Sequence, residues 1–101
     1  MTIKDIKFDY PLGSKFKKLG GNLYKITTEG AVIVRFHNTD IVKKEGGKII
    51  LNSGGWLTAT TKKHINKFLP DYIYIFQKNF AWFLKNTYTG ETKDFCDGIA
   101  I

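Results

Sequence analysis

Residues 22–36 read N-L-Y-K-I-T-T-E-G-A-V-I-V-R-F, and residues 40–52 read D-I-V-K-K-E-G-G-K-I-I-L-N. Each stretch contains two runs rich in β-branched and aromatic residues. Glu29-Gly30 separates the runs in the first stretch, and Gly46-Gly47 separates them in the second. Two-residue connections that contain glycine are typical of tight β-hairpins. The two stretches therefore predict consecutive antiparallel hairpins.

A third hairpin is predicted over residues 72–85, with Lys78-Asn79 as its turn. Alternation along its strands places apolar side chains on both faces, and both faces are expected to be covered. One face would carry Ile73, Ile75, Phe80, Trp82 and Leu84. The other face would carry Tyr72, Tyr74, Phe76 and Phe83. This second set could be core under a helix, a contact between subunits, or a platform on which nucleic-acid bases stack.

One short helix is predicted near residues 61–69, between the second and third hairpins. Thr60 or Thr61 would cap its start, and Pro70 would end it. Its apolar stripe consists of Ile65, Phe68 and Leu69. Its solvent side would carry Lys62, Lys63, Asn66 and Lys67. A helix of about two turns is too short to be stable alone, so it must pack on the sheet.

The length of 101 residues, with 43% hydrophobic residues, indicates a single folded domain. Residues 1–14 have mixed charges and predict an extended N-terminal arm, and residues 15–101 would form the domain. We expect an α+β fold. It would consist of one strongly curved antiparallel sheet of about six strands, which could close as a small barrel or roll, with the helix packed on it.

The charge of the chain is strongly basic, with 16 Lys and Arg against 9 Asp and Glu and a net charge of +7. Such a balance favours anionic partners or simply keeps the protein soluble. Arg35 is the only arginine. Because base-edge recognition relies on arginine, a broad sequence-reading DNA surface is disfavoured. The single cysteine, Cys96, and the absence of a signal peptide predict a protein of the cytoplasm without membrane partners.

The stretch from residue 52 to residue 66 has the features of an anion site. Two glycines allow the backbone to turn sharply, and threonines and lysines follow where the helix should begin. A helix N-terminus offers N–H donors and a positive dipole end. The candidate ligand-binding residues here are Asn52, Ser53, Gly54, Trp56, Thr60, Thr61, Lys62 and Lys63. The alternative is structural: the glycines serve a bulge, one threonine caps the helix, and the lysines are solvated.

A second candidate cluster, at the end of one strand and the start of the next, consists of Arg35, His37, Asn38, Thr39 and Asp40. Alternation along the strand would place Arg35 and His37 on one face. A lone arginine in a lysine-rich chain suggests the gripping of a phosphate or a buried carboxylate. The alternative is a structural ion pair with Asp40 or a more distant acid. His37-Asn38-Thr39 also matches half of the paired His-x-Thr motif of two-histidine phosphoesterases, but His64 lacks the following hydroxyl residue.

No other pattern predicts catalysis, a metal site or a cofactor. The two histidines and the cysteine have no metal-binding spacing, and Cys96 has no base nearby in the sequence. We therefore expect a protein that is not an enzyme and that needs neither metal nor cofactor.

Two blocks of the chain carry a family resemblance, one over residues 18–66 and one over residues 77–98. The first includes L-N-S-G-G-W-L-T-A-T-T-K-K-H-I-N, and the second includes Gln77-Lys78-Asn79-Phe80 and Asp97-Gly98. They resemble a family of small uncharacterised accessory proteins of tailed phages and prophages. The resemblance implies a gene product that acts in the cytoplasm of an infected bacterium by binding a host component, such as a defence protein or its nucleotide signal.

The leading hypothesis is a non-enzymatic binder of a phosphate-bearing ligand, either a nucleotide or a cyclic oligonucleotide signal, used for counter-defence or host takeover. The first alternative is an inhibitor of a host defence enzyme that acts through a basic surface. The second is a weak binder of single-stranded nucleic acid. The aromatic hairpin could also assemble the chain into a homo-oligomer with ligand sites between subunits.

Overall fold

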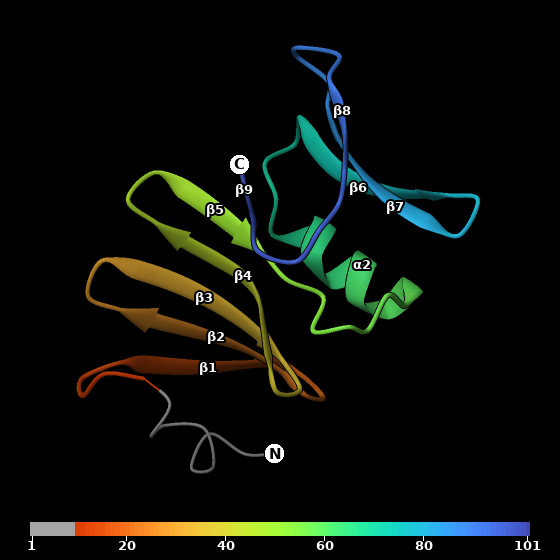
Figure 1. Ribbon diagram of the computed structural model, residues 1–101. Helices are drawn as coiled ribbons and strands as arrows, with labels where there is room; N and C mark the ends of the chain where they lie inside the picture. The colour runs from red at the N-terminus through yellow and green to blue at the C-terminus, as the bar shows by residue number, and fades with distance from the viewer. Residues whose placement is uncertain (1–9) are drawn as a thin grey trace.

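The computed structural model describes residues 10–101 and contains two antiparallel sheets and one helix (Figure 1). The larger sheet has six strands in the order β1 (Lys15–Gly20), β2 (Leu23–Thr28), β3 (Ala31–Phe36), β4 (Thr39–Glu45), β5 (Lys48–Leu51) and β9 (Ile99–Ala100). The smaller sheet has three strands in the order β6 (Ile73–Lys78), β7 (Ala81–Asn86) and β8 (Thr92–Asp94). The helix is α2 (Ala59–Lys67).

The predicted fold class is confirmed, because the strands pair antiparallel throughout and one short helix accompanies them. The three predicted hairpins are also present as β2–β3, β4–β5 and β6–β7. The single sheet was wrong, since the chain leaves the first sheet after β5, passes through α2 and starts a second one. The barrel alternative was also wrong. The first sheet stays open because β1 and β9 form its opposite edges.

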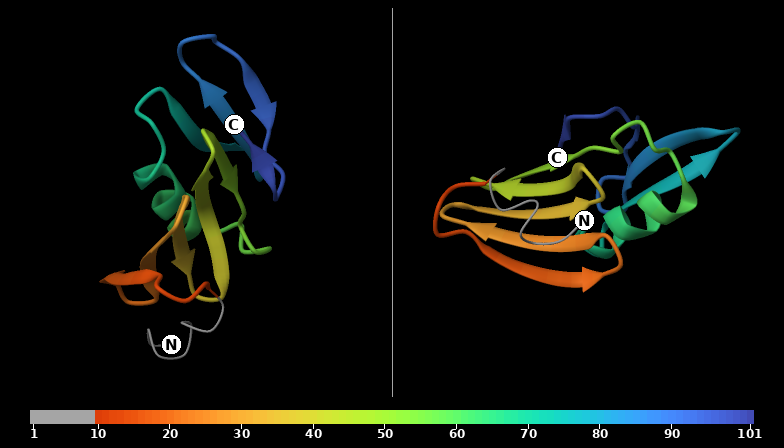
Figure 2. Two further views of the ribbon diagram at one scale, coloured as in Figure 1. Left: turned by 90° about the vertical axis from the view of Figure 1, so that its left-hand side faces the viewer. Right: turned by 90° about the horizontal axis from the view of Figure 1, so that it is seen from below.

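One hydrophobic core joins the two sheets and the helix. From the six-stranded sheet come Leu23, Val34, Ile41, Val42 and Leu51. The helix and the segment after it contribute Ile65 and Leu69, and the three-stranded sheet contributes Ile75, Trp82 and Leu84. In both views of Figure 2, α2 lies where the two sheets meet. The shared core explains why a helix of nine residues is stable: burial of its apolar side compensates for its short length.

The six-stranded sheet buries apolar residues on its second face as well. Tyr24, Ile26 and Ile33 form a separate cluster there, and Tyr10 and Phe16 pack against it. The Tyr10 ring meets the Phe16 ring edge-on at 5.9 Å. The end of the predicted N-terminal arm therefore contacts the sheet, and residues 1–9 of that arm lie outside the described residues.

Helix α2 begins two residues earlier than predicted. Thr58, rather than Thr60 or Thr61, is the N-cap, and its hydroxyl accepts a hydrogen bond from the backbone N–H of Thr61 at 3.2 Å. Thr61 is itself buried, so it occupies a core-facing position of the first turn. The helix ends at Lys67, earlier than the predicted residue 69, and Phe68 is its C-cap. The sequence T-A-T-T places three threonines near the start of the helix. Because Thr61 packs in the core, the helix begins so that the first of them, Thr58, is the N-cap.

Asn66 was expected on the solvent side of the helix, and the structure corrects this. Its side-chain amide donates to the Ile75 carbonyl at 2.9 Å and accepts from the Ile75 N–H at 2.7 Å. Both groups of Ile75 lie at the edge of β6, where no strand pairs with them. Asn66 thus replaces a neighbouring strand and attaches α2 to the three-stranded sheet.

The turn of the third hairpin lies one residue later than predicted, at Asn79-Phe80, and both residues have positive φ, 53° and 65°. Moving a two-residue turn by one position shifts the pairing by two residues, so every strand residue keeps its face. Phe80 is the exception. It was predicted on a strand, on a face that would be covered, but it lies in the turn and is 95% exposed.

Candidate functional site

A cleft of about 530 Å³ lies between the β3–β4 turn and the start of α2. We call it the α2 cleft. Its volume falls within the range of small-molecule sites. It is lined by Phe36, His37, Asn38, Thr39, Trp56, Thr58, Thr60 and Thr61. Two segments that are separated in the sequence, residues 36–39 and 56–61, thus meet at one concave surface.

The first wall of the α2 cleft is a tight turn between β3 and β4. Phe36 pairs with Thr39, which leaves His37 and Asn38 as the two turn residues. His37 has a positive φ of 54°, as such turns require, and its N–H donates to the Asn22 carbonyl at 2.9 Å. The imidazole lies against the Phe36 ring, with 4.3 Å between centroids. This contact holds the imidazole at the cleft.

The second wall is the loop between β5 and α2, and Gly54 sets its position. Gly54 has a φ of +66°, and a methyl group on it would overlap the side chain of Thr39. Only glycine therefore allows the loop to approach the β3–β4 turn this closely. Gly55, with a φ of +82°, has no neighbour within 4 Å of such a methyl group. Its role is the backbone turn alone.

Asp97, from the C-terminal segment, holds the same loop in place through hydrogen bonds with Ser53. Its Oδ1 accepts hydrogen bonds from the Ser53 N–H at 2.7 Å and from the Ser53 hydroxyl at 2.8 Å. Ser53 Oγ in turn accepts from the Gly55 N–H at 3.1 Å. Ser53 is buried, so its hydrogen-bonding capacity serves the loop itself. Asn52 likewise contributes a backbone contact, its N–H donating to the Ile41 carbonyl at 3.0 Å.

Polar groups and one exposed ring face the opening of the α2 cleft. Trp56 is 67% exposed, which is unusual for so large an apolar side chain and leaves an indole surface accessible to a ligand. The hydroxyl of Thr60 is on an exposed residue, whereas that of Thr61 accepts from the Thr58 hydroxyl at 3.1 Å. An indole with hydroxyl and amide groups around it suits a flat, polar ligand.

None of the eight residues that line the α2 cleft is acidic, and none is a lysine or an arginine. Lys62 and Lys63 belong to the first turns of α2 but do not line the cleft, so they act on a ligand only through their field. His64 lies nearby, 4.6 Å from the Phe36 ring. Burial lowers the pKa of His64, and the positive charges of Lys67 and Lys63 lower it further.

The structure does not bring Arg35 to this cleft. The strand ends at Phe36, so alternation does not continue to His37, and Arg35 lies on the face that carries Tyr24, its partner in β2. Its guanidinium donates to the Tyr10 hydroxyl at 3.0 Å and to the His37 carbonyl at 3.2 Å. It also lies 3.9 Å from Asp40. This is the structural ion pair that was the alternative interpretation of Arg35.

Tyr10 completes that group of side chains. Its hydroxyl donates to Asp40 Oδ1 at 2.6 Å, and burial raises the pKa of Tyr10 far above its ordinary value, so the proton needed for this bond stays in place. The phenol therefore links Arg35 and Asp40 and holds residue 10 on the second face of the six-stranded sheet.

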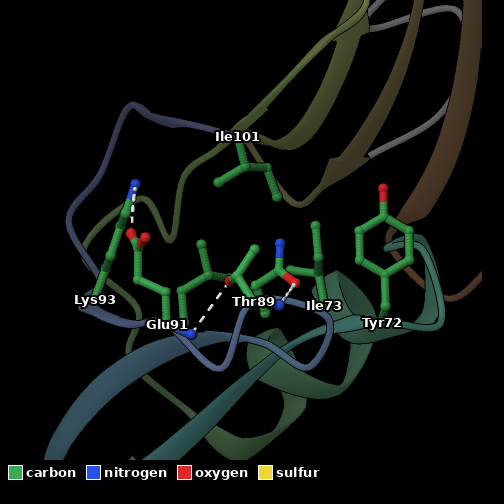
Figure 3. Close-up of a pocket in the computed structure, with 8 residues that line it drawn as sticks. Tyr72, Ile73, Thr89, Glu91, Lys93 and Ile101 are labelled. Carbon is green, nitrogen blue, oxygen red and sulfur yellow. Dashed lines mark hydrogen bonds and ion pairs between the residues drawn. The ribbon is translucent and has the colours of Figure 1, made fainter.

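The aromatic residues of the third hairpin divide into two groups. Phe76 and Phe83 stack at 5.4 Å, and Tyr74 lies 5.9 Å from Phe76. Tyr72, expected with them, instead lies against Tyr88 at 4.6 Å. Tyr72 also lines a smaller cavity of about 310 Å³, whose other lining residues include Ile73, Thr89, Glu91, Lys93 and Ile101 (Figure 3).

The described part of the chain was also compared with the requirements of a metal site, a two-histidine site and a membrane-spanning helix. Across residues 10–101, no three histidine, cysteine, aspartate or glutamate residues gather as a group that could hold a metal ion. His37 and His64 both contact Phe36, but only His37 lines the cleft. In the same residues, no helix has the length and apolar character needed to cross a membrane.

Of the ten candidate ligand-binding residues, four line the α2 cleft: His37, Trp56, Thr60 and Thr61. Ser53 and Gly54 position the loop behind it. Four further lining residues were not among these ten: Phe36, Asn38, Thr39 and Thr58. Asn38 and Thr39 belonged to the second candidate cluster but had no predicted contact with a ligand. Phe36 and Thr58 have no local signal, because they reach the cleft through packing.

Residues 13–101 match the family described as Kyanoviridae Gp96 protein. Comparisons with curated proteins and with solved structures gave no match. The resemblance to phage proteins is thereby confirmed, and an accessory role remains a prediction. Because the match spans well over half of the chain, the chain belongs to the Kyanoviridae Gp96 family of phage proteins.

Proposed function

We propose that this phage protein binds a nucleotide or a related phosphate-bearing aromatic ligand in the α2 cleft, without turning it over. One observation carries the proposal: residues 36–39 and 56–61 converge on a cleft of about 530 Å³ that combines an exposed indole, an imidazole, hydroxyls and an amide with no acidic lining residue. A base needs a ring to stack on and polar groups at its edge. A phosphate needs donors and positive potential.

The lining residues divide naturally between the two halves of such a ligand. Trp56 is the surface on which a base would stack, and Asn38 carries an amide that can both donate to and accept from the base edge. Thr58 and Thr60 border the cleft at the first turn of α2, where the helix dipole and backbone N–H groups favour an anion. His37 supplies an imidazole on the opposite wall.

Sequestration is the role that fits such a binder in a phage. A protein that holds a nucleotide without converting it lowers the free concentration of that nucleotide in the infected cell. If the ligand is a nucleotide signal of host defence, the consequence is counter-defence. This broader role rests on the phage family and on the proposed ligand class together.

The test is a thermal-shift screen followed by titration calorimetry, with mononucleotides, cyclic dinucleotides and cyclic trinucleotides as ligands. Binding to the folded state raises the melting temperature, and well above the Kd the rise grows with the logarithm of the ligand concentration. Trp56→Ala should abolish the shift. Tyr88→Ala is the matched control, because Tyr88 is also an exposed aromatic residue, at 81%, and lies outside the cleft. The proposal fails if no nucleotide shifts the melting temperature, or if both variants lose the shift equally.

Two further variants sharpen the assignment. Arg35→Lys should lower the melting temperature of the free protein and change the nucleotide-induced shift less than His37→Ala does, since Arg35 does not line the cleft and contacts it only through the His37 carbonyl. His37→Ala should weaken the shift. Any nucleotide that binds is then incubated with the protein and analysed by chromatography, and no product should appear. A product that is formed by the original protein but not by His37→Ala would show that the protein is a phosphoesterase and not only a binder.

A further inference from the structure

The three-stranded sheet presents a row of aromatic rings on the face that does not form the core. Alternation along β6 and β7 puts Ile75, Trp82 and Leu84 inward, and all three are buried. The opposite face carries Tyr74, Phe76 and Phe83, which we call the aromatic face. None of the three belongs to either core cluster of the described residues, and Tyr74 is 38% exposed.

The rings of the aromatic face are ordered against one another. Phe76 and Phe83 are cross-strand partners whose rings stack with an interplanar angle of 26° and centroids 5.4 Å apart. Tyr74 precedes Phe76 by two residues on the same strand, with 5.9 Å between centroids. Three rings in contact along a twisted sheet form a rigid, preorganised surface. Planar rings can stack on such a surface at little entropic cost.

Lysines lie at both ends of the same face. Lys85 is paired with Tyr74, and Lys78 follows Phe76 by two residues, so pairing and alternation place both on the aromatic face. Asp94, paired with Phe83, is its one acidic neighbour in the ladder. Aromatic rings between two cations match a ligand that carries bases and phosphates along one strand.

The charge of the chain also argues against a second copy as the occupant. Each copy carries a net charge of +7, and burial of two aromatic faces against each other would bring four lysines but only two aspartates, the two copies of Asp94, to one interface. Like charges at an interface oppose association unless they are paired. A polyanion, in contrast, gains from the same charges.

We infer that the aromatic face binds single-stranded nucleic acid, with bases stacked on Tyr74, Phe76 and Phe83 and phosphates beside Lys78 and Lys85. The inference is independent of the α2 cleft, because none of these residues lines that cleft. The sequence preference should be weak, since stacking uses the faces of the bases and not their edges.

The experiment measures fluorescence anisotropy of labelled single-stranded DNA and RNA oligonucleotides of about ten nucleotides, a length within the usual site size. The double variant Tyr74→Ser, Phe76→Leu should lower affinity at least about fivefold, the loss expected for removal of one stacked base. Leucine keeps the partly buried position apolar, and an unchanged far-UV circular dichroism spectrum verifies folding. Tyr88→Ala is the control and should bind the oligonucleotide normally, because Tyr88 is an exposed aromatic residue that lies outside both the aromatic face and the α2 cleft.

The lysines are tested through the salt dependence of binding. Replacing Lys78 and Lys85 by Gln should reduce the slope of log K against log salt by about 1.4 in magnitude, because each lost phosphate contact on a single strand removes about 0.7. Lys44→Gln with Lys48→Gln gives the same charge change on exposed residues of the other sheet, and it should leave the slope nearly unchanged.

Three results would overturn the inference. The first is no oligonucleotide binding at low salt. The second is equal loss of binding in the two lysine pairs, which would mean attraction by net charge alone. The third is a dimer in sedimentation velocity that Tyr74→Ser, Phe76→Leu converts to monomer, which would make the aromatic face a subunit contact. Failure of the α2 cleft proposal gives a different pattern, since that proposal depends on Trp56 and on nucleotide-induced thermal shifts.

Discussion

The six-stranded and three-stranded sheets both carry apolar residues on two faces, yet they bury these faces to different extents. In the six-stranded sheet, the second face buries Tyr24, Ile26 and Ile33, with Tyr10 packed against them. In the three-stranded sheet, the second face leaves Tyr74 and its neighbours partly exposed. Strands with apolar residues on both faces occur in both sheets, but only the six-stranded sheet buries its second face in a core cluster. The second face of the six-stranded sheet therefore adds to the buried core, whereas that of the three-stranded sheet stays partly accessible to solvent.

The two sheets also attach to α2 in different ways. The six-stranded sheet contacts the loop before the helix through close packing of the Thr39 side chain against Gly54, where an added methyl group would not fit. The three-stranded sheet is attached through the two hydrogen bonds between Asn66 and Ile75. Steric contacts tolerate no added atom, whereas hydrogen bonds fail when a polar atom is removed. The following variants test these contrasts.

The largest effect is expected from truncation of the shared core. Ile41→Ala should lower the free energy of unfolding by about 2–5 kcal/mol, because Ile41 is fully buried in β4 and its removal leaves a cavity. Phe83→Ala removes more atoms but from a partly exposed face, and it should cost only about 1 kcal/mol. Urea denaturation followed by tryptophan fluorescence measures both. Equal losses would mean that the aromatic face is part of the core.

Gly54→Ala should be next, at about 2–4 kcal/mol, because strain at positive φ adds to an overlap with Thr39. Gly55→Ala is the matched control. It introduces similar backbone strain without a neighbouring atom, and about 1 kcal/mol is expected. The difference between the two variants measures the steric contact alone. Identical melting temperatures would show that the loop can move away from Thr39.

Asn66→Ala should cost about 1–3 kcal/mol, since it leaves the N–H and carbonyl of Ile75 without their side-chain partner at the edge of β6. Lys67→Ala, at the next and exposed position of α2, should change stability by a few tenths of a kcal/mol. Hydrogen exchange adds a local measurement: the Ile75 amide should lose protection in Asn66→Ala more than amides of β3 do.

The smallest effect concerns pH. The pKa of His64 is lowered on folding, so the unfolded chain binds its proton more readily than the folded protein does. The contribution of His64 is therefore fully present above pH 6.5, its ordinary value, and it is lost as pH falls toward the lowered value. Melting temperatures between pH 7 and pH 5 should fall less in His64→Gln than in the original protein. Parallel curves would contradict this assignment.

Local pattern was sufficient for the hairpins and for the existence of the helix. The β2–β3 and β4–β5 hairpins follow from alternation and from the glycines in their turns. The third hairpin kept its two faces even though its turn moved by one residue, because a shift of two in pairing preserves alternation. The prediction that all strands form one sheet was wrong, because the pattern within each strand does not indicate whether strands before and after a helix pair with each other.

The candidate site shows the same division. The glycine pair, the tryptophan and the threonines of residues 54–61 were identifiable from the sequence as a candidate binding segment, and His37 was identifiable from its polar neighbours. The exposure of the tryptophan came only from the structure. Their meeting at one cleft, together with Phe36 and Thr58, required the fold. Arg35 shows why: His37 lies in the turn after the strand, so strand alternation does not place its side chain together with that of Arg35.

The sequence by itself determined the strand-rich α+β class, the hairpins, one short helix, the basic charge and the segments that carry unusual polar residues. These properties depend on contacts between residues close in the chain and on composition. Only the tertiary structure decided that the strands form two sheets, that Arg35 pairs with Tyr10 and Asp40, and that one aromatic set stays partly exposed. Those outcomes depend on contacts between distant segments, whose energies compete across the whole molecule and leave no periodic signal in the sequence.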